Sequence, residues 1–175
     1  YLRDGSRGNE LWDHIMEVGK PMGLVPGHTS TIRRIEGGML SYQADMDYTV
    51  NPFELGLGRL VDLEMDADFI GKKALKKIKS DGIKRTQVGI EISCTPLKHP
   101  NTSYWPIMVG SEEVGYITSA VYSPRLDKNI ALAMMDVNHS AIDTAAETTT
   151  PEGNFPIKVV QKPFYDPKKK ITSGS

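Results

Sequence analysis

The chain has 175 residues, of which 39% are hydrophobic and 25% are charged, and its formal net charge is -1. This composition is typical of a globular protein with a buried core, and the balanced charge gives no electrostatic reason to expect nucleic-acid binding. The single cysteine, Cys94, excludes an internal disulfide. No apolar run approaches the ~20 residues that cross a bilayer. We therefore expect a cytoplasmic protein that binds neither nucleic acid nor membranes.

The first thirty residues predict a strand end followed by a helix. Residues 1–3 have the pattern of a strand end, and a turn follows. From Asn9, apolar residues recur at helical spacing (Leu11, Trp12, Ile15, Met16 and Val18). Asn9 is the expected cap and Gly19 the expected stop. We expect Trp12 to anchor this helix in a core.

A second helix is predicted from Thr31, with the polar residues 28–31 as its caps. It would turn four apolar side chains inward, namely Ile32, Ile35, Met39 and Leu40. Glu36 has two interpretations, and the residues leave both open. It is spaced to form a surface ion pair with Arg33. Alternatively, the glycines at 37 and 38 let the backbone beside Glu36 approach a ligand.

The next fifty residues contain an apolar run and a basic helix. The run from Phe53 to Leu63 is broken by Gly56 and Gly58, which predicts a strand with a tight bend. A further helix is expected over 72–79, with the Asp68 carboxylate near its positive N-terminal end. Its five lysines indicate a solvated face. The polar stretch 80–85 is the best domain boundary.

The remainder of the chain predicts a small antiparallel β-barrel or sandwich. Turn residues separate five short β-rich pieces, at 87–93, 107–109, 114–119, 130–135 and 155–160. Val88, Ile90 and Ile92 alternate as one buried face requires. The polar stretch 144–150 is expected to be an exposed loop. The predicted division is therefore an α/β part over 1–80, a β domain over 86–167 and a basic tail over 168–175.

Residue types that carry chemistry are scattered rather than clustered. The four histidines show no metal-ligand spacing, so we expect no metal site. Cys94 has no His–Asp or His–Asn constellation around it and is expected to be an inert, semi-buried thiol. The residues alone therefore indicate no catalytic group.

The order of several motifs nevertheless resembles one enzyme family. The first half contains R-I-E-G-G-x-L-x-Y-x-x-D-M, then N-P-F-E-L-G-L-G, then D-F-I-G-K-K-A-L. The second half contains V-G-x-E-I, then V-G-Y-I-T-S-A-V-Y-S-P-R-L-D-K-N-I-A-L-A, then K-P-F-Y-D-P. In this order the motifs resemble the glycine-cleavage T-protein family of folate-dependent enzymes, over almost the whole chain.

The resemblance implies an α+β fold. The C-terminal part of an α/β folate-binding domain would be followed by a small antiparallel β-barrel of Greek-key type. It also implies a tetrahydrofolate-dependent transferase that moves a one-carbon unit from a small donor. The family's acidic catalytic residue lies in an N-terminal part that this chain lacks. We therefore expect no catalytic residue here, an inactive fragment that needs the missing part of the same protein, and a possible homodimer.

One departure from the family pattern bears on the donor. Aminomethyltransferases usually read A-R-D-S-L-R-L-E-A-G where this chain reads H-T-S-T-I-R-R-I-E-G-G, so Ser30 replaces an active-site arginine. The R-I-E-G-G-M-L-S-Y form is more similar to dimethylsulfoniopropionate demethylases, which move a sulfonium methyl group to tetrahydrofolate. An aminomethyltransferase and a non-catalytic barrel module remain the alternatives.

Four residues are candidates for a folate or substrate cavity: Arg34, Glu36, Tyr42 and Tyr165. Arg34 and Glu36 keep the family's places in the first motif. A carboxylate can orient a pterin by hydrogen bonds, and an aromatic face can hold a cationic donor. Each candidate also has a structural interpretation: an ion pair for Glu36, core packing for Tyr42 and the barrel edge for Tyr165.

Overall fold

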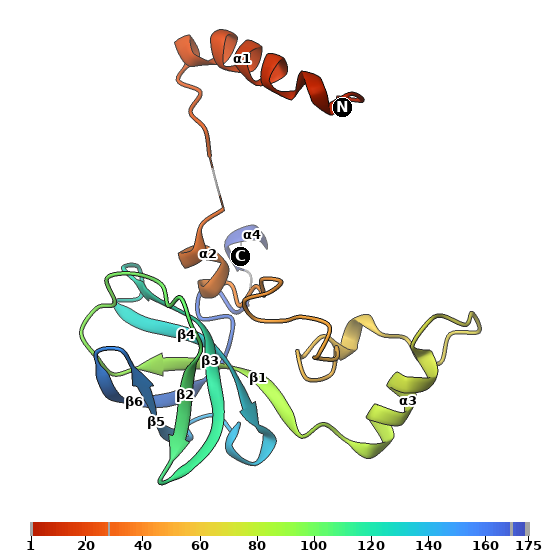
Figure 1. Cartoon of the computed structure of the whole chain (residues 1–175), viewed down its shortest axis with the longest axis vertical. Helices are drawn as coiled ribbons and strands as arrows, with labels where there is room; N and C mark the ends of the chain where they lie inside the picture. The colour runs from red at the N-terminus through yellow and green to blue at the C-terminus, as the bar shows by residue number, and fades with distance from the viewer. Residues whose placement is uncertain (1, 28, 169, 174–175) are drawn as a thin grey trace. The chain divides into compact units, whose positions relative to one another are not determined.

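The computed structural model describes residues 2–27, 29–168 and 170–173, and the chain divides into two compact units, Tyr1–Ser30 and Thr31–Ser175 (Figure 1). The first unit contains a short 3₁₀ turn, η1 (Gly5–Arg7), the helix α1 (Gly8–Gly19) and a second turn, η2 (Lys20–Met22). In η1, the Asp4 carboxylate accepts a hydrogen bond of 3.0 Å from the Ser6 backbone N–H.

Helix α1 confirms the helix predicted in this unit, but not its surroundings. Its N-cap position is Arg7 rather than Asn9. Trp12 is 53% exposed, so the prediction that it anchors a core is wrong for this unit, because thirty residues supply no second element to cover it. Leu11, Ile15 and Val18 are exposed on the same helix. The predicted strand end is also wrong at residues 2–3, and Tyr1 lies outside the described residues.

The second unit is built on a closed antiparallel barrel. Its strands are β1 (Arg85–Ile92), β2 (Trp105–Val109), β3 (Glu112–Ser123), β4 (Lys128–Asp136), β5 (Ala145–Thr150) and β6 (Gly153–Val160). They follow one another around the barrel in the order β1-β4-β3-β2-β5-β6. Because β1 lies beside β4 rather than β2, the connection is of Greek-key type, as expected. A 3₁₀ turn, η4 (Val137–His139), follows β4.

Alternating side chains fill the barrel. Val88, Ile90 and Ile92 of β1 are all buried, which confirms the predicted face. The expected loop at 144–150 is wrong, because most of it forms β5. Its inward residue Thr148 is fully buried, and the hydroxyl donates to the Pro106 carbonyl oxygen at 2.9 Å. A buried threonine that satisfies its hydroxyl in this way gives no apolar alternation in the sequence.

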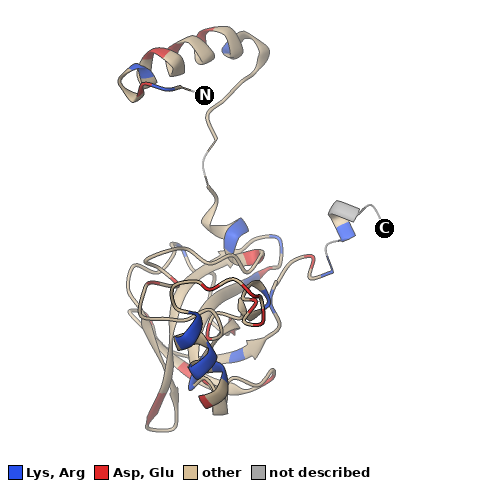
Figure 2. Ribbon diagram, turned by 90° about the vertical axis from the view of Figure 1, so that its right-hand side faces the viewer, with Lys and Arg blue, Asp and Glu red and all other residues tan. Residues whose placement is uncertain are grey.

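In the described part of the second unit, three helical segments precede the barrel: α2 (Thr31–Glu36), the 3₁₀ turn η3 (Gly58–Leu60) and α3 (Lys72–Asp81). Helix α4 (Lys170–Ser173) follows it. The strand predicted over 53–63 is wrong. Successive turns occupy this stretch, including a 2.8 Å bond from the Leu57 N–H to the Pro52 carbonyl and a positive φ of 70° at Gly56. The predicted helix at 72–79 is confirmed by α3, whose lysines are prominent in Figure 2.

Helix α2 packs on the outside of β3 and β4. Its Ile35 is fully buried against Val121, Ile130 and Leu132. The helix ends at Glu36 because the next two residues are glycines: Gly38 adopts φ +65°, and the Met39 N–H bonds the Arg34 carbonyl at 2.7 Å. This is a Schellman cap. It turns Met39 outward, so its predicted inward position is wrong.

No helix within the described ranges is long and apolar enough to cross a membrane.

Candidate functional site

The four candidate residues all lie in the second unit. Arg34 and Glu36 occupy the last turn of α2, Tyr42 lies in the loop after it, and Tyr165 lies in the segment after β6. The loop and the C-terminal segment both return to the outer side of the barrel. The structure therefore brings these residues to one region, where they take part in three sets of contacts, two of which share Thr118.

The first set is centred on Asp45, whose side chain is completely buried. Its Oδ2 atom accepts hydrogen bonds from Arg34 Nη1 at 2.7 Å and from the Ser41 N–H at 2.9 Å. Its Oδ1 atom accepts from the Thr118 and Ser119 hydroxyls, both at 2.6 Å. Arg34 Nη2 also donates to the Ser119 Oγ atom at 2.8 Å. Arg34 is thus fixed to the barrel by a carboxylate that four donors satisfy.

A bulge in β3 makes this arrangement possible. Successive side chains of a regular strand point to opposite faces. Between Ile117 and Ser119 the pairing of β3 with β4 shifts register, which leaves Thr118 as an extra residue. The bulge re-aims its side chain. Two adjacent hydroxyl groups can therefore donate to one carboxylate oxygen.

The second set joins Glu36 to Tyr165. The Glu36 side chain is 5% exposed, and its Oε1 atom accepts a hydrogen bond from the Ser123 hydroxyl at 2.6 Å. The Arg125 Nη1 atom lies 3.7 Å from Oε2, and the Arg125 guanidinium lies 4.2 Å from the centroid of the Tyr165 ring. The Glu36 carbonyl also accepts from the N–H groups of Phe164 and Tyr165. Of the two interpretations of Glu36, the surface pair with Arg33 is therefore wrong, because the carboxylate points to the barrel.

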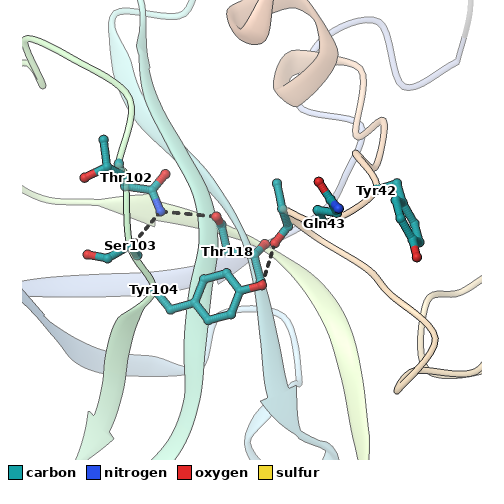
Figure 3. Close-up of a pocket in the computed structure, with 8 residues that line it drawn as sticks. Tyr42, Gln43, Thr102, Ser103, Tyr104 and Thr118 are labelled. Carbon is teal, nitrogen blue, oxygen red and sulfur yellow. Dashed lines mark hydrogen bonds between the residues drawn. The ribbon is translucent and has the colours of Figure 1, made fainter.

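The third set is a pocket of about 550 Å³ beside Tyr42 (Figure 3). One side is the loop after α2, and the other is the segment that leads into β2. Its lining comprises Tyr42, Gln43, Ala44, Asn101, Thr102, Ser103, Tyr104 and Thr118. Tyr42 is 61% exposed, so it lines an open surface instead of packing in a core.

Hydrogen bonds and ring stacking hold the walls of this pocket. The Tyr104 hydroxyl donates to the Ala44 carbonyl at 3.0 Å and so ties the two sides together. The rings of Tyr104 and Tyr116 stack with centroids 5.0 Å apart. Asn101 Nδ2 donates to the Ser103 and Thr118 carbonyl oxygens. Because its lining has aromatic rings, hydroxyls and amides but no charged side chain, the pocket suits a flat, hydrogen-bonding ligand.

Metal binding and thiol chemistry receive no support. Across the described residues, no three His, Cys, Asp or Glu side chains form a group that could hold a metal ion. Cys94 is partly buried, as predicted, and Asn129 Nδ2 lies 3.3 Å from its sulfur atom. Burial raises the pKa of the Cys94 thiol, so the reactive thiolate is disfavoured.

Lys162 is an ionisable group near these sets that the sequence did not single out. Burial lowers the pKa of its amine to about 8, although the negative charge of Asp45 acts in the opposite direction. The native pKa therefore lies below the 10.5 of an ordinary lysine. Burial of the amine therefore destabilises the fold; this cost begins to decrease near pH 8, where the native amine loses its proton, and vanishes above pH 10.5, where the amine of the unfolded chain is neutral as well.

We expect this cost to be visible in the pH dependence of stability. Between pH 8 and 10.5 the unfolded state binds more protons at this site than the native state does, so the free energy of unfolding increases as the pH rises. Allowing for partial exposure, the Lys162→Met variant should be roughly 2 kcal/mol more stable than the parent chain at pH 7. Urea unfolding at several pH values should show this difference shrinking above pH 8.

The comparison with the variant is essential for that measurement. Cys94, Tyr104 and Tyr122 have raised pKa values, so they lower the free energy of unfolding as the pH rises into the alkaline range. This contribution is the same in the parent chain and in the variant, and it cancels in the comparison. A stability difference that stayed constant between pH 7 and 10 would contradict the lowered pKa of Lys162.

Comparison with known proteins identifies the family. Residues 1–65 match the model of the GCVT N-terminal domain, and residues 85–166 match that of the glycine cleavage T-protein C-terminal barrel domain. The chain belongs to the glycine-cleavage T-protein family. The two matches follow one another in the same order as the motifs.

Individual T-protein relatives agree. An aminomethyltransferase of Bacillus mycoides is 37% identical over 163 residues, which cover 91% of this chain and 43% of the relative. An aminomethyltransferase of Symbiobacterium thermophilum is 40% identical over 158 residues, covering 89% and 41% respectively. The chain thus spans less than half the length of these curated relatives. The crystal structure of glycine cleavage system aminomethyltransferase T from Bartonella henselae shares the fold, with a TM-score of 0.69 and 21% identity over 78% of this chain and 38% of that one.

The T-protein motifs have clear structural roles in this chain. Within R-I-E-G-G, the arginine bonds Asp45, the glutamate bonds Ser123, and the second glycine forms the helix cap. Sequence reasoning did not select Asp45, Thr118 or Ser119 for the site. The sequence did hold a signal for them: Asp45 is the acidic residue of the first T-protein motif, and Thr118 and Ser119 are adjacent hydroxyl residues of the motif in the barrel half.

Proposed function

We propose that the whole protein transfers a one-carbon unit from a small donor to tetrahydrofolate. Residues 1–80 would belong to its folate-binding part, and residues 86–167 to its C-terminal barrel. The family and its aminomethyltransferase relatives support this type of reaction. Among the structural features, the pocket beside Tyr42 carries the proposal furthest, because its aromatic and amide lining suits a flat heteroaromatic molecule.

The proposed roles of the four candidates follow from their contacts. Tyr42 would contact the folate directly, because its ring is exposed at the pocket. Arg34 would position the loop that carries Tyr42, since it is bonded to Asp45 in that loop. Glu36 and Tyr165 would position the segment after β6 through Arg125. None of the four would act as an acid or base.

The pocket suits a reaction that needs little proton transfer. A sulfonium methyl group is already electrophilic, so the enzyme mainly has to hold the donor and folate N5 in line. Two charged side chains beside the pocket, those of Arg34 and Asp45, are committed to a buried pair with each other. Chemical groups beyond this chain would supply any further assistance.

We infer that the donor is a methylated sulfonium or amine, with dimethylsulfoniopropionate as the leading example. The reason is Ser30, which stands where aminomethyltransferases carry an active-site arginine. The second candidate is aminomethyl transfer from a carrier protein, as in the glycine cleavage system. It is favoured by the names of the relatives, all of which are aminomethyltransferases in the matches given above.

An assay of the whole protein separates these functions. Incubation with tetrahydrofolate and dimethylsulfoniopropionate should yield 5-methyltetrahydrofolate, detected by mass spectrometry. Formation of 5,10-methylenetetrahydrofolate from an aminomethylated lipoyl carrier, with no methyl product, would overturn the sulfonium proposal in favour of the second candidate. If neither product formed, the proposal of one-carbon transfer itself would be refuted. The 175-residue chain alone should be inactive and serves as the background control.

A binding experiment tests the role of the pocket. In the whole protein, the Tyr42→Ala variant should bind tetrahydrofolate about fivefold more weakly, because it loses an aromatic contact worth about 1 kcal/mol. Tyr48→Ala is the matched control, since Tyr48 belongs to the same loop, is 91% exposed and does not line the pocket. Isothermal titration calorimetry gives both dissociation constants. Equal constants for the two variants would rule out a direct contact from Tyr42.

A further inference from the structure

The segment that follows β6 is held against the loop after α2. The N–H groups of Phe164 and Tyr165 both donate to the Glu36 carbonyl, at 2.9 and 3.1 Å. The stem of Lys162 packs beside Gly38, where an added Cβ atom would lie 3.6 Å from the Lys162 Cβ atom. These contacts fix the base of the Lys162 side chain in a partly buried position.

The charged groups on the neighbouring elements are already paired with one another. Arg34 on α2 bonds Asp45, and Glu36 on α2 pairs with Arg125 from the turn after β3. Asp45 is the group whose charge acts on Lys162, but its two oxygens already accept four hydrogen bonds. Within the described part of the chain, no hydrogen bond or ion pair reaches the Lys162 amine.

An amine that is partly desolvated and unpaired is a poor ammonium ion and a good nucleophile. No acceptor stabilises the ammonium form, and the nitrogen lone pair becomes available when this form loses a proton. With a pKa of about 8, roughly a fifth of this amine is neutral at pH 7.4, against about 0.1% for an ordinary lysine. Lys162 therefore differs in its surroundings from the exposed lysines of α3, such as Lys76.

We propose that the Lys162 amine is a covalent modification site for small, uncharged aldehydes. The neutral nitrogen attacks the carbonyl carbon, so that a C–N bond forms while the C=O π bond breaks and its electron pair moves to oxygen; a proton then moves from nitrogen to oxygen to give a carbinolamine. Loss of water then gives an imine, so no oxidant or reductant is consumed. A neutral imine suits this position better than an ammonium ion, since it requires less solvation. Partial burial restricts the site to small reagents.

Reductive trapping in the native 175-residue chain tests this assignment. Brief exposure to formaldehyde with sodium cyanoborohydride converts each imine to a methylated lysine, which peptide mass spectrometry quantifies. At pH 7.4, methylation of Lys162 should be at least about tenfold faster than that of Lys76 and Lys158. Lys76 is an exposed lysine of α3. Lys158 is the opposite control, because its hydrogen bond to Asp143 raises its pKa.

Two further readouts separate this site from a generally reactive lysine. The rate at Lys162 should rise with a midpoint near pH 8, and its advantage over Lys76 should disappear in 8 M urea, where the local burial is lost. Equal rates at Lys162 and Lys76 in the native chain would overturn the proposal. So would an advantage that persisted in urea, because it would then reflect local sequence rather than the fold.

Discussion

Replacing Asp45 with alanine is expected to lower the free energy of unfolding of the barrel unit by about 3–5 kcal/mol. The change leaves the Arg34 guanidinium near a buried region without its counter-charge, and it removes the acceptor of the Thr118 and Ser119 hydroxyls. Urea unfolding followed by the fluorescence of Trp105, which is buried in the barrel, measures this loss.

Asp47 provides the matched control for that experiment. It lies two residues away in the same loop and is exposed, and its carboxylate accepts hydrogen bonds from the N–H and hydroxyl of Thr49. Asp47→Ala should cost less than about 1 kcal/mol. A combined Arg34→Met and Asp45→Leu variant should recover much of the stability, since replacing both charges removes the unpaired one. A loss at Asp45 no greater than that at Asp47 would show that the buried pair contributes little.

The Gly115→Val variant is expected to destabilise the barrel by about 3 kcal/mol or more. A Cβ atom at Gly115 would lie 2.3 Å from the Met134 carbonyl oxygen and 2.8 Å from the Met135 Cα atom. Both are backbone atoms of β4, so the pairing between β3 and β4 has to move to admit the new side chain. Thermal unfolding and amide exchange of β3 and β4 would report the change.

Gly89 in β1 gives a graded comparison. A Cβ atom there would lie 3.0 Å from the Val160 carbonyl and 3.1 Å from the Phe164 ring, which can rotate away. Gly89→Ala should therefore be milder than Gly115→Ala, which meets the backbone more closely. If Gly115→Val were tolerated as well as Gly89→Ala, this would contradict the close approach of the β4 backbone to Gly115.

The barrel was predictable from the sequence because its strands alternate. Ile90 and its neighbours in β1 show a period of two, and the turn residues mark where strands end. Strand β5 was missed because Thr148 is buried while its sequence is polar. The stretch 53–63 was predicted as a strand because turns rich in leucine have the same composition as a strand.

The candidate site was predictable only in part, for a different reason. Arg34 and Glu36 could be selected because they stand in a motif with two glycines. Their partners could not, because Ser119 and Ser123 lie on β3, far along the sequence, and local spacing carries no information about such contacts. Lys162 was missed as well, since only the fold shows that its amine lacks a partner.

The two hydrogen bonds to the Glu36 carbonyl have a topological consequence. They join a residue that precedes every strand of the barrel to residues that follow the last strand. The hydrogen bonds thus close the chain from Glu36 to Tyr165 into a loop that contains all six strands, and the bonds themselves lie outside the sheet. Separation of any one pair of strands leaves these two hydrogen bonds intact. Release of the C-terminal segment, in contrast, removes both hydrogen bonds from the Glu36 carbonyl and leaves α2 held by its contacts with the barrel, such as that between Glu36 and Ser123.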